Sequence, residues 1–90
     1  MSTQEILAGA GNVEVPCVLA LRSQGFTLSR KVIDGHEEWR AERPDLLLIA
    51  DAPLSLLGLV SLRERRGRQW RASDEEIDAF FQEFYPDSIE

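Results

Sequence analysis

Apolar and polar residues alternate over residues 26–33 and again over residues 37–43. This period of two is typical of strands that bury one face. The dipeptide Asp34-Gly35 lies between the two stretches and favours a two-residue hairpin turn. Residues 46–50, Leu-Leu-Leu-Ile-Ala, are continuously apolar over the length of a strand. We therefore expect three sequential strands in a mainly antiparallel sheet.

Helix signals lie on both sides of these strands. Pro16 fits a first helical position and Gly25 fits the left-handed position after a helix end, so we expect a short helix that ends just before Gly25. Residues 52–66 predict a second helix, with Asp51 as its N-cap and Gly67 as its stop.

The end of the chain predicts a third helix. Ser73 and Glu76 have the spacing of a capping box, and Pro86 ends the segment. The apolar positions between them recur at i, i+3, i+4 and i+7, which places them on one stripe. They are Ile77, Phe80, Phe81 and Phe84.

These elements predict a two-layer α+β fold, with a three-stranded sheet, helices on one face and the order α-β-β-β-α-α. Ninety residues supply one modest core and one domain, which we assign to residues 13–90. Residues 1–12 are expected to be a flexible N-terminal tail, since Gly9 and Gly11 break any helix there.

The helix predicted over residues 52–66 is apolar nearly all round its first three turns, which is typical of burial on more than one side. One explanation places the sheet on one side and the first and last helices on the other. The alternative is that Leu59 and Leu62 contact another chain, and Gly58 would let a neighbouring backbone approach closely.

Residues 46–50 raise the same question for the sheet. If Leu48 faces the helices, Leu47 and Ile49 share the other face with charged residues, at the edge of a simple meander. Such an edge needs a cover, either from the chain's own terminal segments or from a second subunit in a symmetric dimer. The candidate interface residues are thus Leu47, Ile49, Leu59 and Leu62.

The net charge of −6 opposes a general role on nucleic acids or anionic membranes. Half of the basic residues nevertheless gather around Trp70, in a basic cluster that spans residues 63–71. It provides candidate anion contacts that can grip phosphates and stack a base. The favourable position of cations at a helix C-terminus, and the acids of the next helix, explain the cluster equally well. The candidate anion-contact residues are Arg65, Arg66, Arg68, Trp70 and Arg71; the acids are Asp74, Glu75, Glu76 and Asp78.

Candidate catalytic chemistry is sparse. One cysteine, Cys17, and one histidine, His36, form no zinc-ligand pattern, and no phosphate loop or nucleophile motif is present. We therefore predict no catalytic residues, no metal and no cofactor. The single cysteine fits a cytoplasmic protein, and we expect neither a signal peptide nor a membrane span.

Two resemblances follow from these elements. The order α-β-β-β-α over residues 16–66 is similar to that of double-stranded RNA-binding domains. Their second helix opens with lysines, whereas this one opens with Asp51-Ala52-Pro53-Leu54, so we exclude RNA binding of that kind. The second half resembles a family of small bacterial proteins, and that resemblance implies a fold but no activity. The residues that carry it are Leu56-Leu57-Gly58-Leu59, Arg66-Gly67, Trp70 and Ser73-Asp74-Glu75-Glu76.

We expect a non-enzymatic domain that acts through protein–protein contact. The contact is either self-association, as a homodimer, or binding of a partner, and the acid-rich residues 74–90 would suit a basic partner such as a toxin. The alternative is nucleic-acid contact through the basic cluster and Trp70. A small-molecule enzyme that unites His36 with carboxylates is the third hypothesis.

Overall fold

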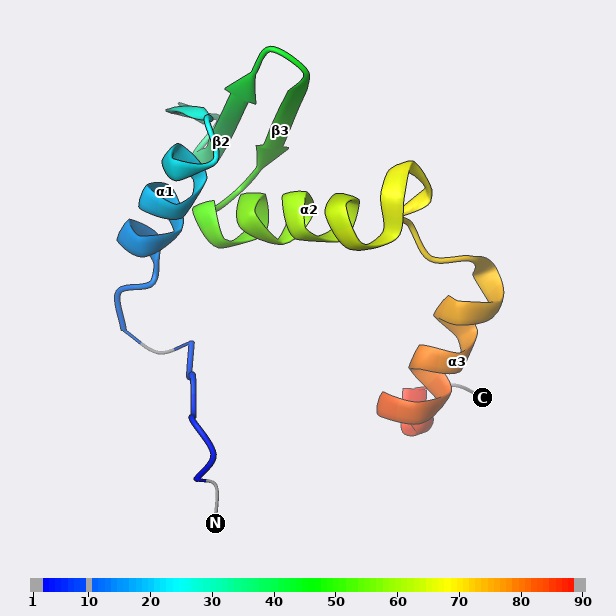
Figure 1. The fold of residues 1–90 in the computed structure, drawn as a ribbon. Helices are drawn as coiled ribbons and strands as arrows, with labels where there is room; N and C mark the ends of the chain where they lie inside the picture. The colour runs from blue at the N-terminus through cyan, green and yellow to red at the C-terminus, as the bar shows by residue number, and fades with distance from the viewer. Residues whose placement is uncertain (1–2, 10, 89–90) are drawn as a thin grey trace.

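The fold is described from a computed structural model, which covers residues 3–9 and 11–88 (Figure 1). The three helices and three strands follow the order α-β-β-β-α-α, so the predicted α+β fold class is confirmed. The elements are α1 (Glu14–Ser23), β1 (Thr27–Ile33), β2 (His36–Arg43), β3 (Leu46–Ala50), α2 (Pro53–Arg66) and α3 (Asp74–Phe84), with short 3-10 helices η1 (Gly67–Gln69) and η2 (Pro86–Ser88).

The sheet is an antiparallel meander with the order β1-β2-β3. Asp34 and Gly35 both have positive φ, 51° and 80°, as a tight hairpin turn of type I′ requires. Leu28, Ala41 and Leu48 lie directly across from one another on the three strands. This row defines the face of the sheet that the helices cover.

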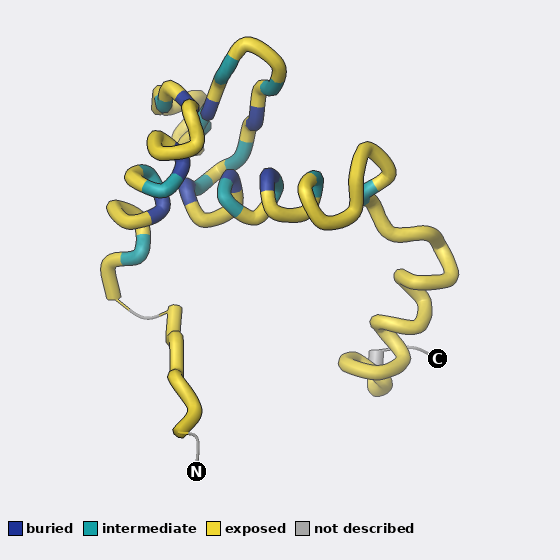
Figure 2. Tube along the Cα trace, viewed as in Figure 1, coloured by how far each residue is buried: buried dark blue, intermediate teal, exposed yellow. Residues whose placement is uncertain are grey.

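The core lies between that face and the pair of helices α1 and α2, which contact each other and the sheet. Buried residues appear only in this part of the described chain in Figure 2. Leu21 of α1 and Leu56 of α2 are fully buried, and Val60 lies one turn further along α2. The cluster of buried residues consists of Leu21, Phe26, Ala41, Leu48, Leu56 and Val60.

Two helix starts differ from the sequence prediction. α1 begins at Glu14, so that Pro16 is its third residue; it still lies in the first turn, where backbone N–H groups have no helical partner. The prediction of Asp51 as the N-cap of α2 is wrong, because the N-cap is Ala52. Ala52 precedes Pro53, and the proline ring drives it to an extended conformation and moves the boundary by one residue.

α3 does not join this core. It lies beyond the far end of α2 and away from the sheet, and every residue of it is exposed (Figures 1 and 2). Its main contacts are with η2, which follows it. The radius of gyration is 16.5 Å, against about 12 Å for a compact domain of this length. The expectation that the last helix packs against α2 opposite the sheet is therefore wrong, and α1 lies beside α2 on the same face of the sheet.

The departure of α3 begins at Gly67, which ends α2 with a φ of 76°, a conformation that favours glycine. η1 follows, and residues 70–73 lead into α3 without regular helical structure. At the other end of the chain, residues 3–9 have no regular secondary structure and are exposed. They do not cover the sheet or α3 (Figure 1).

A matched pair of substitutions on α1 tests this description of the core. Leu21 is 0% exposed and Leu19 is 57% exposed, on the same helix. Leu21→Ala should lower the free energy of unfolding by about 2–5 kcal/mol, because it leaves a cavity in the core. Leu19→Ala should change it by less than about 0.5 kcal/mol. Urea denaturation followed by circular dichroism measures both, and equal losses would contradict this core.

Candidate protein interface

The outer face of β3 carries two exposed apolar side chains. Leu47 lies across from Glu42 and Ile49 lies across from Arg40, on the face that the helices leave uncovered. Leu47 is 43% exposed and Ile49 is 46% exposed. β3 is also an edge of the sheet, and no strand of the described chain pairs with its outer side. The expected apolar edge is thus present, and the chain's own described terminal segments do not cover it.

A small hollow of about 160 Å³ lies where β3 meets α2. It brings together three of the four interface residues expected from the sequence, and adds Trp70 from the turn after α2. Trp70 is half-buried and borders the hollow. The lining residues are Leu46, Leu47, Leu48, Ile49, Leu59, Arg63 and Trp70.

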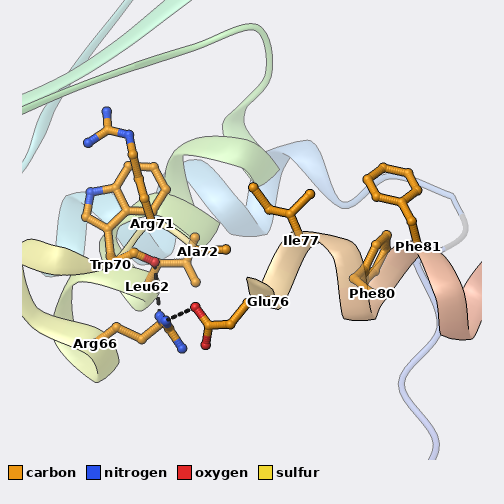
Figure 3. A pocket seen from close by; sticks show the side chains of 9 residues that line it. All are labelled: Leu62, Arg66, Trp70, Arg71, Ala72, Glu76, Ile77, Phe80 and Phe81. Atoms are coloured by element: carbon orange, nitrogen blue, oxygen red, sulfur yellow. Dashed lines mark hydrogen bonds and ion pairs between the residues drawn. The ribbon is translucent and has the colours of Figure 1, made fainter. Parts of the chain in front are cut away.

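A larger open hollow of about 710 Å³ lies between the end of α2 and α3 (Figure 3). Leu62, the fourth expected interface residue, borders it. Trp70 lines both hollows, so the two are adjacent. We call Leu47, Ile49, Leu59, Leu62 and Trp70 together the β3–α2 surface.

The far wall of the larger hollow is the apolar stripe of α3. The predicted spacing is confirmed, since these residues lie on one helix, but their side chains remain 42% to 61% exposed. The ring centroids of Phe80 and Phe81 are 5.3 Å apart, and those of Phe80 and Phe84 are 5.2 Å apart. The rings thus pack on one another and not on the core. The α3 stripe consists of Ile77, Phe80, Phe81 and Phe84.

The arginines of the basic cluster have two different surroundings. Arg66 donates from Nε to the backbone oxygen of Trp70 at 3.0 Å, and its Nη2 lies 3.6 Å from Oε1 of Glu76. The guanidinium of Arg71 lies over the Trp70 ring, 4.6 Å from its centroid (Figure 3). Arg65 and Arg68 form no ion pair with any described residue.

The acids of α3 therefore neutralise much less of the basic cluster than the sequence suggested. Glu76 is paired with Arg66, but Asp74, Glu75 and Asp78 form no ion pair within residues 3–9 and 11–88. The reason is geometric, because α3 turns away from α2 directly after the basic cluster. Unpaired positive charge remains beside the β3–α2 surface, and unpaired negative charge remains on α3.

The start of α3 is fixed by the predicted capping box, which is confirmed. Oγ of Ser73 accepts from the backbone N–H of Glu76 at 3.2 Å, and Oε1 of Glu76 accepts from the backbone N–H of Ser73 at 2.8 Å. This backbone N–H, the Ser73 hydroxyl and the charge of Arg66 together lower the pKa of Glu76 from its usual 4.5.

Cys17 and His36 do not line either hollow. Cys17 is 4% exposed, as expected for a small buried apolar residue. His36 lies next to the hairpin turn and is exposed. Glu37 accepts from Arg30 Nε at 2.7 Å and Glu38 accepts from Arg40 Nε at 3.0 Å. These arginine hydrogen bonds lower the pKa of both carboxyls.

Comparison with protein-family models, curated proteins and solved structures finds no match to this chain. Over the part of the chain that the structure describes, no group of histidine, cysteine and acidic side chains is arranged to hold a metal ion. No helix in that part is long and apolar enough to cross a membrane.

The structure adds the α3 stripe to the interface residues expected from the sequence. The stripe is visible in the sequence as a helical pattern, but that pattern does not say what covers it. One signal could have marked it as different. Acids flank it on both sides of the helix, Asp74 and Asp78 on one side and Glu76 and Glu83 on the other.

Acid titration tests the cap at the start of α3. Because the pKa of Glu76 is lowered in the folded state, its stabilisation is complete above pH 4.5 and is lost as the pH falls through the folded-state pKa. The Ser73 amide proton should therefore shift in NMR spectra as the pH falls below 4.5. In Glu76→Gln, which keeps the acceptor but does not titrate, this shift should disappear. A Ser73 titration unchanged in this variant would contradict the cap.

Proposed function

We propose that this domain works through protein–protein contact, with the β3–α2 surface and the α3 stripe as its contact surfaces. The observation that carries this proposal is the exposure of the whole α3 stripe on a helix that no part of the described core covers. Contiguous apolar surface of several hundred Å² on a monomer is typical of an interaction site. Scattered single apolar residues would need no such explanation.

The length of α3 also supports a contact role. An isolated helix of 11 residues is marginal in water even with good propensity. The capping box contributes only about 1 kcal/mol. Packing of the apolar face against another surface is the usual source of the remaining stability. A partner that covers the stripe would therefore stabilise α3 itself.

Nucleic-acid contact, the alternative function, has less support. Arg65 and Arg68 are free to meet phosphates, but Arg71 already covers one face of the Trp70 ring and Trp70 is half-buried. A base stacked on that face would have to displace the guanidinium. The net charge of −6 and the acids of α3 oppose a polyanion nearby.

Photo-crosslinking in cells tests the proposed contact. A benzophenone amino acid is placed at Phe84, which is 61% exposed on α3. The matched control is Leu19, 57% exposed on α1 and apart from both contact surfaces. Irradiation should give a discrete crosslinked protein species from position 84 and none from position 19. Absence of a species from position 84, or the same species from both positions, would contradict the proposal.

A further inference from the structure

We infer that the partner is a second copy of this chain, in a dimer whose two α3 helices are exchanged. The α3 stripe of each copy packs on the β3–α2 surface of the other. The inference rests on the proposed function, because it identifies what covers the same two surfaces. Three independent features of the chain support it: reciprocity, charge and area.

The first feature is reciprocity. One chain carries both a projecting apolar helix and an uncovered apolar edge, and each remains without a cover within the described residues. A two-fold dimer brings the helix of one copy to the edge of the other, and the same contact occurs twice. Exchange of a terminal helix needs only a change at the connection, here residues 67–73. In this dimer, α3 of the second copy covers Leu47 and Ile49, which the sequence predicts to need a cover.

The second feature is charge. Acids flank the α3 stripe on both sides, and no basic residue follows Ser73. Arginines border both hollows of the β3–α2 surface: Arg63 lines the smaller one, and Arg66 and Arg71 line the larger one. On the sheet face, Arg40 lies beside Ile49 and Glu42 lies beside Leu47. Among the described residues of one chain, a single ion pair joins the acids of α3 to these arginines, between Arg66 and Glu76. In the exchanged dimer, the acids beside the α3 stripe of one copy lie next to the arginines of the other copy. This attraction favours the exchanged arrangement.

The same charges disfavour a simpler dimer in which two α3 stripes face each other. That arrangement brings the acids of both helices to one interface, where Asp74, Glu76, Asp78 and Glu83 of one copy approach those of the other. Like charges at a contact are destabilising. A partner that supplies arginines beside apolar side chains is the better fit, and this chain already carries such a surface.

The third feature is area. The four stripe residues and Tyr85 are each about half exposed. Aromatic side chains bury about 150–250 Å² each, so covering them removes roughly 500 Å² from water on each helix. Two helices and the two surfaces that receive them then bury about 2,000 Å² in total, the size of a stable, specific interface.

Complementation between two variants tests the exchange. The helix variant, Phe80→Asp with Phe84→Asp, loses the stripe but keeps the β3–α2 surface. The edge variant, Leu47→Glu with Ile49→Glu, loses the surface but keeps the stripe, and its substitutions lie on the exposed face of the sheet. The matched control, Thr27→Glu with Ser29→Glu, makes the same change of charge on the exposed face of the opposite edge strand.

Sedimentation equilibrium at tens of micromolar should show the wild type and the control at twice the chain mass of 10.2 kDa. Each variant alone should be a monomer. An equimolar mixture should form a heterodimer, because one intact stripe meets one intact surface. If the double substitutions prevent folding, the single change Phe80→Ala should still raise the dimer dissociation constant at least about tenfold.

Three results would overturn the exchange. The wild type could be a monomer, the edge variant could dimerise as the wild type does, or the mixture of folded variants could form no heterodimer. The crosslinks from position 84 separate this failure from that of the proposed function. A crosslink to a different protein overturns the second copy as partner and leaves the contact function standing. No crosslink at all overturns both.

Discussion

The fold leaves the rings of α3 exposed to water, and this exposure is the main constraint on how the molecule can be completed. The core between the sheet and the pair α1 and α2 is complete without α3, and its central residues Leu21, Leu56 and Val60 are already buried. Covering about 500 Å² of the α3 stripe and Tyr85 is worth on the order of 10 kcal/mol per helix before the costs of association, at about 25 cal/mol per Å². Because the core of the same chain does not cover this apolar surface, α3 is stabilised most by a matching apolar surface outside that core.

The uncovered edge at β3 and the unpaired arginines have the same origin. Once Gly67 and η1 direct the chain away from the sheet, the end of α2 keeps Leu62 exposed and leaves most of the basic cluster without acids beside it. Trp70 stands between the two hollows, with Arg71 on one face of its ring. Apolar surface and charge are thus distributed in two complementary parts, one on α3 and one along β3 and α2.

Local patterns were enough to predict most of the elements from the sequence. The span of residues 46–50, the Asp34-Gly35 turn and the capping box at Ser73 all depend on residues close together in the chain, and the structure confirms them. The position of α3 could not be predicted in this way. Apolar residues at positions i, i+3, i+4 and i+7 show that a helix has an apolar face. They do not show whether the same chain or another chain buries that face. The acids after Ser73 were expected to neutralise the basic cluster because they lie close to it in the sequence. Most of them do not lie close to it in space.

The exchanged dimer can be tested by isotope-filtered NMR on a mixture of labelled and unlabelled chains, which detects only contacts between copies. It predicts intermolecular contacts from the ring protons of Phe80 and Phe84 to the methyl groups of Leu47 and Ile49. Absence of these intermolecular contacts, or contacts between the rings of two α3 helices with none to β3, would contradict the exchanged dimer.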